Sequence, residues 1–171
     1  MVLAPTDFTD QEYAKPRAAF DKALASVTVA STTRGTAVGH DGLKVPVTTA
    51  SAELRTDQFD AIVVVGGQGA MGSLVNDAAL LALLRSAAVQ GKVVGAICLA
   101  PVVLARAGVL RNLPATCYPD ARVIRWLTLN GAEYRAGSVV VSGRVVTASG
   151  PAAADEFARR ILEALGRPPG S

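Results

Sequence analysis

The sequence has few of the residues from which disulfide frameworks and metal sites are built. It holds two cysteines and one histidine among 171 residues, with neither a Cys-x-x-Cys pair nor a Cys/His cluster. Disulfide-rich folds and zinc sites both need more of these residues at characteristic spacings. We therefore expect no metal and no disulfide, and the reducing cytoplasm is the expected compartment.

Long apolar runs and one-sided charge are absent as well. The longest uncharged run, Val93 to Ala105, falls well short of the roughly 20 residues that span a bilayer. The 17 basic residues are scattered, the net charge is +3, and no basic run is interleaved with aromatics. Met1 leads directly into Val2-Leu3-Ala4, without the basic and apolar regions of a secretory signal. We expect no membrane span, no signal peptide and no nucleic-acid partner.

The length and composition suit one compact domain. Half of the residues are hydrophobic and 18% are charged, and a chain of this size buries about two-thirds of its unfolded surface in a single core. The last residues are rich in proline and glycine and cannot continue a helix. We expect a single domain over residues 1–166 and a disordered tail at 167–171.

What is present is a strand-to-helix pattern around Cys98. The apolar run 93–97 predicts a buried strand, and the apolar spacing over 99–110 predicts a helix. A thiol on such a turn lies near the unpaired N–H groups and positive end of the helix, which can lower its pKa from about 8.5. From this stretch alone, a buried structural cysteine is an equally good interpretation.

A second turn of this kind precedes Cys98 in the chain. Residues 61–65 form an apolar run that predicts a strand, and Gly-Gly-Gln-Gly follows at 66–69. A helix with Asn76 as its expected N-cap comes next and ends near Gly91. A right-handed crossover would make the two strands parallel and bring Gly67 and Cys98 to the same edge of the sheet. The glycines do not match the order G-x-G-x-x-G, so no dinucleotide, and no other cofactor, is expected.

The remaining segments complete an α/β pattern. We expect strands at 2–5, 26–31 and 115–117, a polar loop at 6–9, extended pieces within 36–48, helices at 10–25, 121–129 and 151–165, and a hairpin of 138–142 with 145–148. The predicted fold is a flavodoxin-like, doubly wound three-layer sandwich with a mostly parallel sheet and a small added β-hairpin. His40 falls in the polar turn of 39–42, where an exposed loop residue is favoured over a catalytic base.

Four local patterns together resemble the ThiJ/PfpI superfamily. They are Glu12-x-x-x-Pro16, Val63-Val64-Val65-Gly66-Gly67, Ala96-Ile97-Cys98-x-x-Pro101 and the segment from Thr147-x-Ser149-Gly150-Pro151 to Phe157. The superfamily includes intracellular proteases, protein deglycases, glyoxalases and the parkinsonism-associated redox protein. The resemblance covers nearly the whole chain and favours a functional role for Cys98.

The resemblance implies a partner for this cysteine. From its position alone, Glu12 would be an exposed glutamate in a first helical turn. The resemblance instead implies that Glu12 is buried beside Cys98, stays protonated and donates a hydrogen bond to the sulfur. The N–H groups of Gly67 and Leu99 would form an anion hole, and the pKa of Cys98 would fall to about 4 to 7. The implied pocket residues are Gly66, Tyr118 and Pro119.

Three positions depart from the superfamily pattern. Leu99 stands where protease-like members have a histidine, and Met71 is the nearest counterpart of an acid that these members often draw from a neighbouring subunit. Tyr118 stands where deglycase-like members have a histidine, and a tyrosine is a poor base at neutral pH. Cys117 precedes it on an expected strand and should face the other way, as a structural residue.

The expected function is therefore chemistry on reactive carbonyls, of the glyoxalase or deglycase kind, in stress protection. Cys98 would be the nucleophile and Glu12 would move the proton. The alternative is a redox sensor or chaperone acting through oxidation of Cys98 to a sulfinate, and Leu99 disfavours a protease or amidase. The expected partners are a small carbonyl substrate or an oxidant, together with a second copy of the chain packed through Ala18, Ala19 and Ala23.

Overall fold

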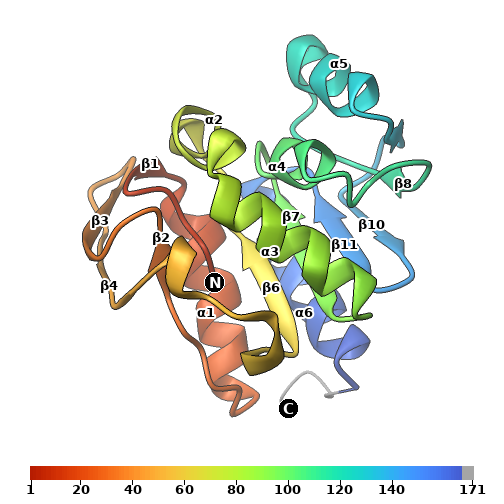
Figure 1. Cartoon of the computed structure of the whole chain (residues 1–171). Coiled ribbons are helices and arrows are strands. Elements are labelled where there is room, and N and C mark those ends of the chain that lie inside the picture. The colour runs from red at the N-terminus through yellow and green to blue at the C-terminus, as the bar shows by residue number, and fades with distance from the viewer. Residues whose placement is uncertain (167–171) are drawn as a thin grey trace.

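The protein folds around a mostly parallel sheet with helices on both faces (Figure 1). The computed structural model describes residues 1–166, and the tail at 167–171 lies outside the described residues. The helices are α1 (Asp10–Lys22), α2 (Gln68–Gly72), α3 (Ala78–Val89), α4 (Pro101–Arg106), α5 (Ala121–Leu129) and α6 (Ala154–Ala164). The strands are β1 (Thr6–Phe8), β2 (Ala30–Ser31), β3 (Gly35–Gly39), β4 (Lys44–Val47), β5 (Thr49–Ala50), β6 (Ala61–Val64), β7 (Val93–Ile97), β8 (Pro114–Ala115), β9 (Glu133–Tyr134), β10 (Val139–Ser142) and β11 (Val145–Ala148). Short 3₁₀ turns occupy Ser51–Glu53, Thr56–Gln58, Leu74–Asn76 and Pro151–Ala153.

The central sheet has the strand order β10-β11-β7-β6. Strands β6, β7 and β11 are parallel, and β10 pairs antiparallel at the edge. Val2 extends the sheet beyond β6, because its N–H donates to Val63 O at 2.8 Å and its carbonyl accepts from the Val65 N–H at 2.9 Å. Val2 also bridges to Ala30 of β2, which pairs in parallel with β5. The parallel pair predicted from the strand-helix-strand pattern of 61–97 is confirmed.

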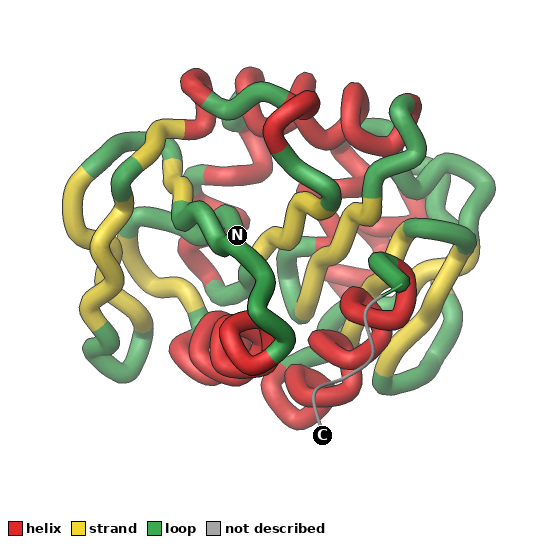
Figure 2. Tube along the Cα trace, turned by 90° about the horizontal axis from the view of Figure 1, so that it is seen from below, coloured by secondary structure: helices red, strands yellow, loops and turns green. Residues whose placement is uncertain are grey.

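Helices form the two outer layers (Figures 1 and 2). Helix α3 packs on β6 and β7 with α4 beside it, and α6 packs on β7 and β11 with α1 beside it. The last helix was predicted from six apolar residues at helical spacing. Leu165 is half-buried, and the other five are buried: Ala154, Phe157, Ala158, Ile161 and Leu162. The three-layer α/β architecture is therefore confirmed.

A second, smaller sheet carries the added β element. Strands β3 and β4 form an antiparallel hairpin, and β1 pairs with β3 in parallel. Beneath it lies a separate apolar cluster of Leu3, Phe8, Tyr13, Val29, Ala37, Val45, Val47 and Val65. The rings of Phe8 and Tyr13 meet edge to face with centroids 6.0 Å apart. This cluster fixes the hairpin to the strand end that precedes α1.

Several local predictions are corrected by tertiary pairing. Thr6–Phe8 is a strand where we expected a polar loop, because β3 supplies the partner. Of the strand expected at 26–31 only Ala30–Ser31 pairs, and the strand expected at 115–117 is the shorter β8. Helix α1 ends at Lys22 rather than 25.

The segment after the glycine loop also differs from the prediction. A short helix, α2, begins directly after Gly67, which has a φ of 105°. The N-cap of α3 is Asp77, whose side-chain Oδ1 accepts from the Leu80 N–H at 3.1 Å, and not Asn76. Within residues 1–166 no single helix has the length and apolarity to cross a membrane. The helical segments 68–76 and 78–89 together have the length and apolar composition of a membrane span, but the chain bends by 83° between them.

Candidate active site

Cys98 lies at the carboxyl end of β7, on a sharp turn that precedes α4. Its φ of 63° is left-handed, a conformation that costs a non-glycine residue about 1 to 3 kcal/mol and often occurs at functional sites. Two backbone hydrogen bonds hold it there: its N–H donates to Ala148 O and its carbonyl accepts from the Tyr118 N–H, each at 2.8 Å. The thiol thus has the position on a strand-to-helix turn that the sequence predicted.

Glu12 is fully buried in the first turn of α1, and not on the surface. Its Oε2 accepts from the Gly66 N–H at 3.1 Å. A β-carbon at position 66 would overlap Glu12 Oε2 and the β-carbon of Cys98, so only glycine fits between them. Oε1 is buried, and no N–H or O–H group of the described residues donates a hydrogen bond to it. Burial raises the pKa of Glu12 to about 7, against smaller opposing effects of Cys98 and Gly66.

The electrostatics of Cys98 differ from the expectation drawn from its turn. Burial raises the pKa of its thiol, and the charge and hydrogen bonding of Glu12 raise it further. The N–H groups of Leu99 and Gly67 hydrogen-bond the sulfur and lower that pKa. The expected fall in the pKa of Cys98 is therefore not found: burial is the largest cause of the rise, and Glu12 adds to it. Two adjacent anions are unfavourable, so Cys98 and Glu12 titrate as a coupled pair and do not both ionise near neutral pH.

The thiol opens into a cavity of about 280 Å³. Its lining residues are Asp7, Thr9, His40, Gly67, Gln68, Cys98, Leu99, Tyr118 and Pro151. Three of the residues predicted for the site besides Cys98 thus border the cavity: Gly67, Leu99 and Tyr118. Gly66 lies behind it, against Glu12. Pro119 is the exception, because the chain turns outward after Tyr118 and leaves it exposed, and Pro151 borders the cavity instead.

His40 was missed as a site residue. It is exposed, as predicted for a loop residue, but it borders the same cavity as Cys98. Its Nδ1 lies 2.8 Å from Asp7 Oδ1, and its backbone N–H donates to Phe8 O at 2.8 Å. No local pattern indicates this placement, because it depends on how the hairpin docks on β1 and α1.

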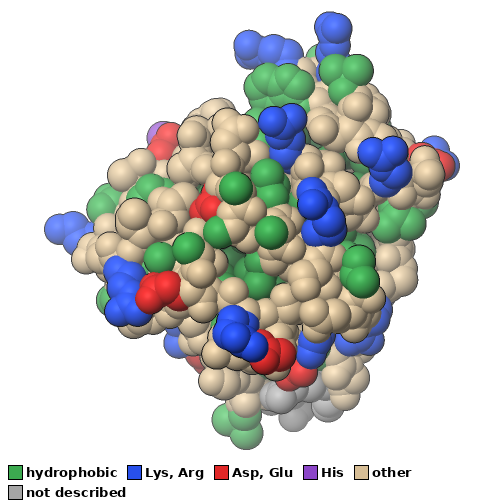
Figure 3. Space-filling model, viewed as in Figure 1, with side chains coloured by type: hydrophobic (Ala, Val, Ile, Leu, Met, Phe, Trp, Pro, Cys, Tyr) green, Lys and Arg blue, Asp and Glu red, His purple; other side chains and the backbone are tan. Residues whose placement is uncertain are grey.

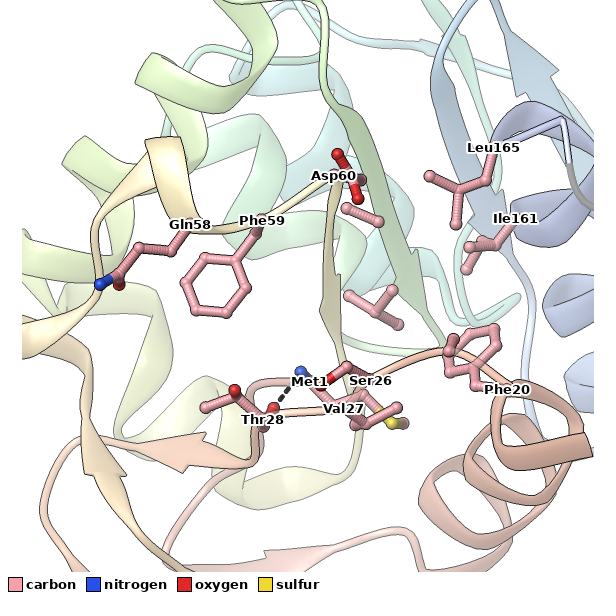
Figure 4. A pocket seen from close by; sticks show the side chains of 13 residues that line it. Met1, Phe20, Ser26, Val27, Thr28, Gln58, Phe59, Asp60, Ile161 and Leu165 are labelled. Atoms are coloured by element: carbon pink, nitrogen blue, oxygen red, sulfur yellow. Dashed lines mark hydrogen bonds between the residues drawn. The ribbon is translucent and has the colours of Figure 1, made fainter. Parts of the chain in front are cut away.

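Another cavity, of about 220 Å³, lies toward the amino end of β6 (Figure 4). Phe20, Phe59, Ile161 and Leu165 point into it, and Asp60 lies at its edge. None of its lining residues is a cysteine or histidine. Ligands of open parallel α/β sheets bind at the carboxyl ends of the strands, where Cys98 lies. The Cys98 cavity is therefore the candidate active site.

A model of the DJ-1/PfpI family matches residues 1–164. The chain belongs to the DJ-1/PfpI family. An uncharacterized protein of Methanocaldococcus jannaschii is 43% identical over 165 residues, which are 96% of this chain and 80% of that protein. A deglycase of Pyrococcus horikoshii is 31% identical, over 96% of this chain and 98% of the deglycase.

Two further comparisons agree with this membership. A glutathione-independent glyoxalase of Caenorhabditis elegans is 32% identical over 127 residues, 74% of this chain and 66% of the glyoxalase. The crystal structure of a ThiJ/PfpI domain protein from Brachyspira murdochii superimposes with a TM-score of 0.91 at 30% identity, over 96% of this chain and 94% of the other. The fold is thus that of DJ-1/PfpI proteins along the whole described chain.

Other residues singled out from the DJ-1/PfpI pattern lie away from the cavity. Cys117 is fully buried, and burial raises the pKa of its thiol to about 12. Met71 is half-buried and packs against the main core. No cluster of three or more His, Cys, Asp or Glu side chains that could hold a metal occurs in residues 1–166.

The surface expected to pair two copies of the chain is partly used within one copy. Ala18 is exposed, whereas Ala19 and Ala23 pack against the core of the same chain. The homodimer stays a prediction. On the face shown in Figure 3, the basic side chains are dispersed over several elements and do not form one continuous patch.

Proposed function

We propose that the protein converts small reactive α-oxo aldehydes into 2-hydroxy acids, with Cys98 as the nucleophile and Glu12 as the group that moves protons. One observation carries the proposal: the fully buried carboxyl group of Glu12 accepts from the Gly66 N–H behind Cys98, whose thiol borders a cavity together with Gly67 and Leu99. The names of the related deglycase and glyoxalase support carbonyl compounds as the substrate class.

In the proposed resting state, Cys98 holds the negative charge of the pair and Glu12 holds the proton. Backbone N–H groups of Leu99 and Gly67 lower the pKa of the thiol by hydrogen bonding, whereas the carboxyl group accepts from one backbone N–H, that of Gly66. If Oε1 held the proton, its O–H could donate to the sulfur, and this buried atom would then have a hydrogen-bond partner. The thiolate is then the member of the pair with the better hydrogen bonding.

The reaction begins when the thiolate forms a C–S bond with the aldehyde carbon, and the carbonyl oxygen takes a proton from Glu12. The Glu12 carboxylate then removes the hydrogen from that carbon and returns a proton to the neighbouring carbon, while the hydroxyl proton of the first carbon passes to the neighbouring oxygen, which leaves a 2-hydroxy thioester on Cys98. Water hydrolyses the thioester to a hydroxy acid, Cys98 leaves as the thiolate, and a proton returns to Glu12. The N–H groups of Gly67 and Leu99 stabilise the oxyanion that forms in these steps.

The test compares the wild type with Cys98→Ser, using Cys117→Ser as a matched control at the other buried cysteine. Each protein is incubated with a panel of aldehydes that includes methylglyoxal, and the hydroxy acid is measured. We expect formation of the acid by the wild type and Cys117→Ser, and none by Cys98→Ser. A wild-type rate no greater than that of Cys98→Ser would refute the proposal.

Oxidation of Cys98 is the second candidate function, in which the protein senses oxidants and protects the cell against stress. The same N–H donors that face the sulfur, together with a protonated Glu12, could hold the oxygens of a sulfinate. Each equivalent of peroxide transfers one oxygen to sulfur and leaves as water. If the aldehyde panel gives no turnover while peroxide yields a stable Cys98 sulfinate, this function replaces the first.

A further inference from the structure

A histidine–carboxylate pair borders the Cys98 cavity and is not part of the Cys98–Glu12 pair. His40 Nδ1 lies 2.8 Å from Asp7 Oδ1, and both residues line the cavity. Within the described chain Nε2 of His40 has no hydrogen-bond partner. A carboxylate on one ring nitrogen fixes the proton there and leaves the other nitrogen as an acceptor. Nε2 is thus available to a molecule in the cavity.

The turn that carries His40 is held in place by several contacts. The Asp10 carboxylate accepts from the N–H groups of Asp41 at 3.0 Å and Leu43 at 2.8 Å. The His40 N–H donates to Phe8 O at 2.8 Å. The turn is therefore fixed to the beginning of α1, the helix that positions Glu12.

Stability gives little reason for the His40–Asp7 contact. The two side chains are 74% and 43% exposed. Exposed ion pairs contribute little to the free energy of folding. Asp7 nevertheless adopts a left-handed φ of 58°, an uncommon conformation that is frequent at functional sites. A role at the cavity explains this arrangement better than a structural role.

We infer that His40, oriented by Asp7, is the general base that activates water for hydrolysis of the Cys98 thioester. The inference rests on the proposed function. The water oxygen forms a bond to the thioester carbon as its proton passes to His40 Nε2, the C–S bond then breaks, and sulfur leaves as the thiolate. His40 returns its proton to solvent.

The other groups of the cavity are less suited to this step. Glu12 has no exposed surface and would have to reach water past Cys98, whereas His40 faces solvent. Tyr118 is a poor base at neutral pH. The hydrogen bond from Asp7, together with the charges of Asp7, Asp41 and Asp10, raises the pKa of His40, which makes its neutral form a stronger base.

The experiment uses methylglyoxal with the wild type, His40→Gln, His40→Ala and Asp7→Asn, and Lys44→Gln as a control on the same hairpin. We expect kcat of His40→Gln to fall by about 10²-fold or more, the usual contribution of a general base. A covalent adduct on Cys98 should accumulate, persist after removal of free aldehyde and be released by hydroxylamine, as a thioester is. Imidazole in the buffer should restore turnover to His40→Ala, and Lys44→Gln should behave as the wild type.

Asp7→Asn tests the orienting role separately. Asparagine tolerates the left-handed backbone but removes the charge, so the pKa of His40 should fall and the acid limb of the kcat profile should move to lower pH. If the wild type turns over methylglyoxal and His40→Gln has the same kcat, this inference is overturned and the proposed function stands. The same holds if kcat of His40→Ala falls but no adduct accumulates and imidazole does not restore turnover. Absence of wild-type turnover would overturn both.

Discussion

Burial of Glu12 predicts an unusual dependence of stability on pH. Burial raises the pKa of this carboxyl group from 4.5 to about 7 in the folded protein. In the unfolded chain the group returns to its ordinary value. Between these two pH values the folded state binds the proton and the unfolded state does not, so folding is favoured at the acid end of this range.

The sign and size of the effect follow from these two values. The contribution is fully present below pH 4.5 and is lost as the pH rises through about 7. Each pKa unit corresponds to about 1.4 kcal/mol, so the free energy of unfolding should fall by about 3 kcal/mol across the range. This is a large fraction of the ~5 to 15 kcal/mol by which domains are stable.

Urea unfolding at a series of pH values between about 4 and 8 measures this loss, and Glu12→Gln is the matched control because it keeps the shape and cannot ionise. The wild type should lose stability as the pH rises, and Glu12→Gln should lose about 3 kcal/mol less. Cys98→Ala should keep the loss, because burial, and not the thiol, is the main cause of the raised pKa. Parallel curves for the wild type and Glu12→Gln would show that Glu12 has an ordinary pKa.

Three further predictions concern the same site. Gly66→Ala should cost about 1 to 3 kcal/mol in urea unfolding and should abolish aldehyde turnover, because its β-carbon would overlap Glu12 Oε2 and the β-carbon of Cys98; a variant of wild-type stability would contradict the close packing. Limiting peroxide should oxidise Cys98 to the sulfinate before it modifies the fully buried Cys117, and peptide mapping that finds Cys117 modified first would count against a reactive Cys98. Purified protein should cleave casein and short amide substrates no faster than Cys98→Ala does, since Leu99 cannot protonate a leaving amine; cleavage well above that control would restore the protease hypothesis.

The main sheet and the position of Cys98 could be predicted because they depend on local pattern and one general rule. Residues 61–65 and 93–97 are apolar runs separated by a helix, and neighbouring strands joined by such a crossover run parallel. Parallel strands end at one edge, so Gly67 and Cys98 had to meet there. Gly67 and Cys98 line the same cavity, and the Gly67 N–H lowers the pKa of the thiol.

The rest of the site depends on tertiary contacts that no local pattern contains. Position in a first helical turn predicted an exposed Glu12, and only the family resemblance indicated its burial. His40 reaches the cavity because the Asp10 carboxylate binds the hairpin turn, a contact between residues about 30 apart in sequence. The low pKa of Cys98 was predicted from the turn and from a protonated Glu12, whereas burial is the largest effect and raises the pKa, as does the charge of Glu12.

The central claim is that Cys98, and not Glu12, carries the negative charge of the pair at neutral pH. Thiolate absorbance at about 240 nm, followed against pH with Cys98→Ser as the blank, measures this directly. Cys117 does not interfere, because burial raises its pKa to about 12. The account predicts a thiolate that forms as the pair loses its first proton, with a midpoint near pH 7, and that is lost in Cys98→Ser. A thiolate that forms only above about pH 8.5, the value of a free cysteine, would contradict it.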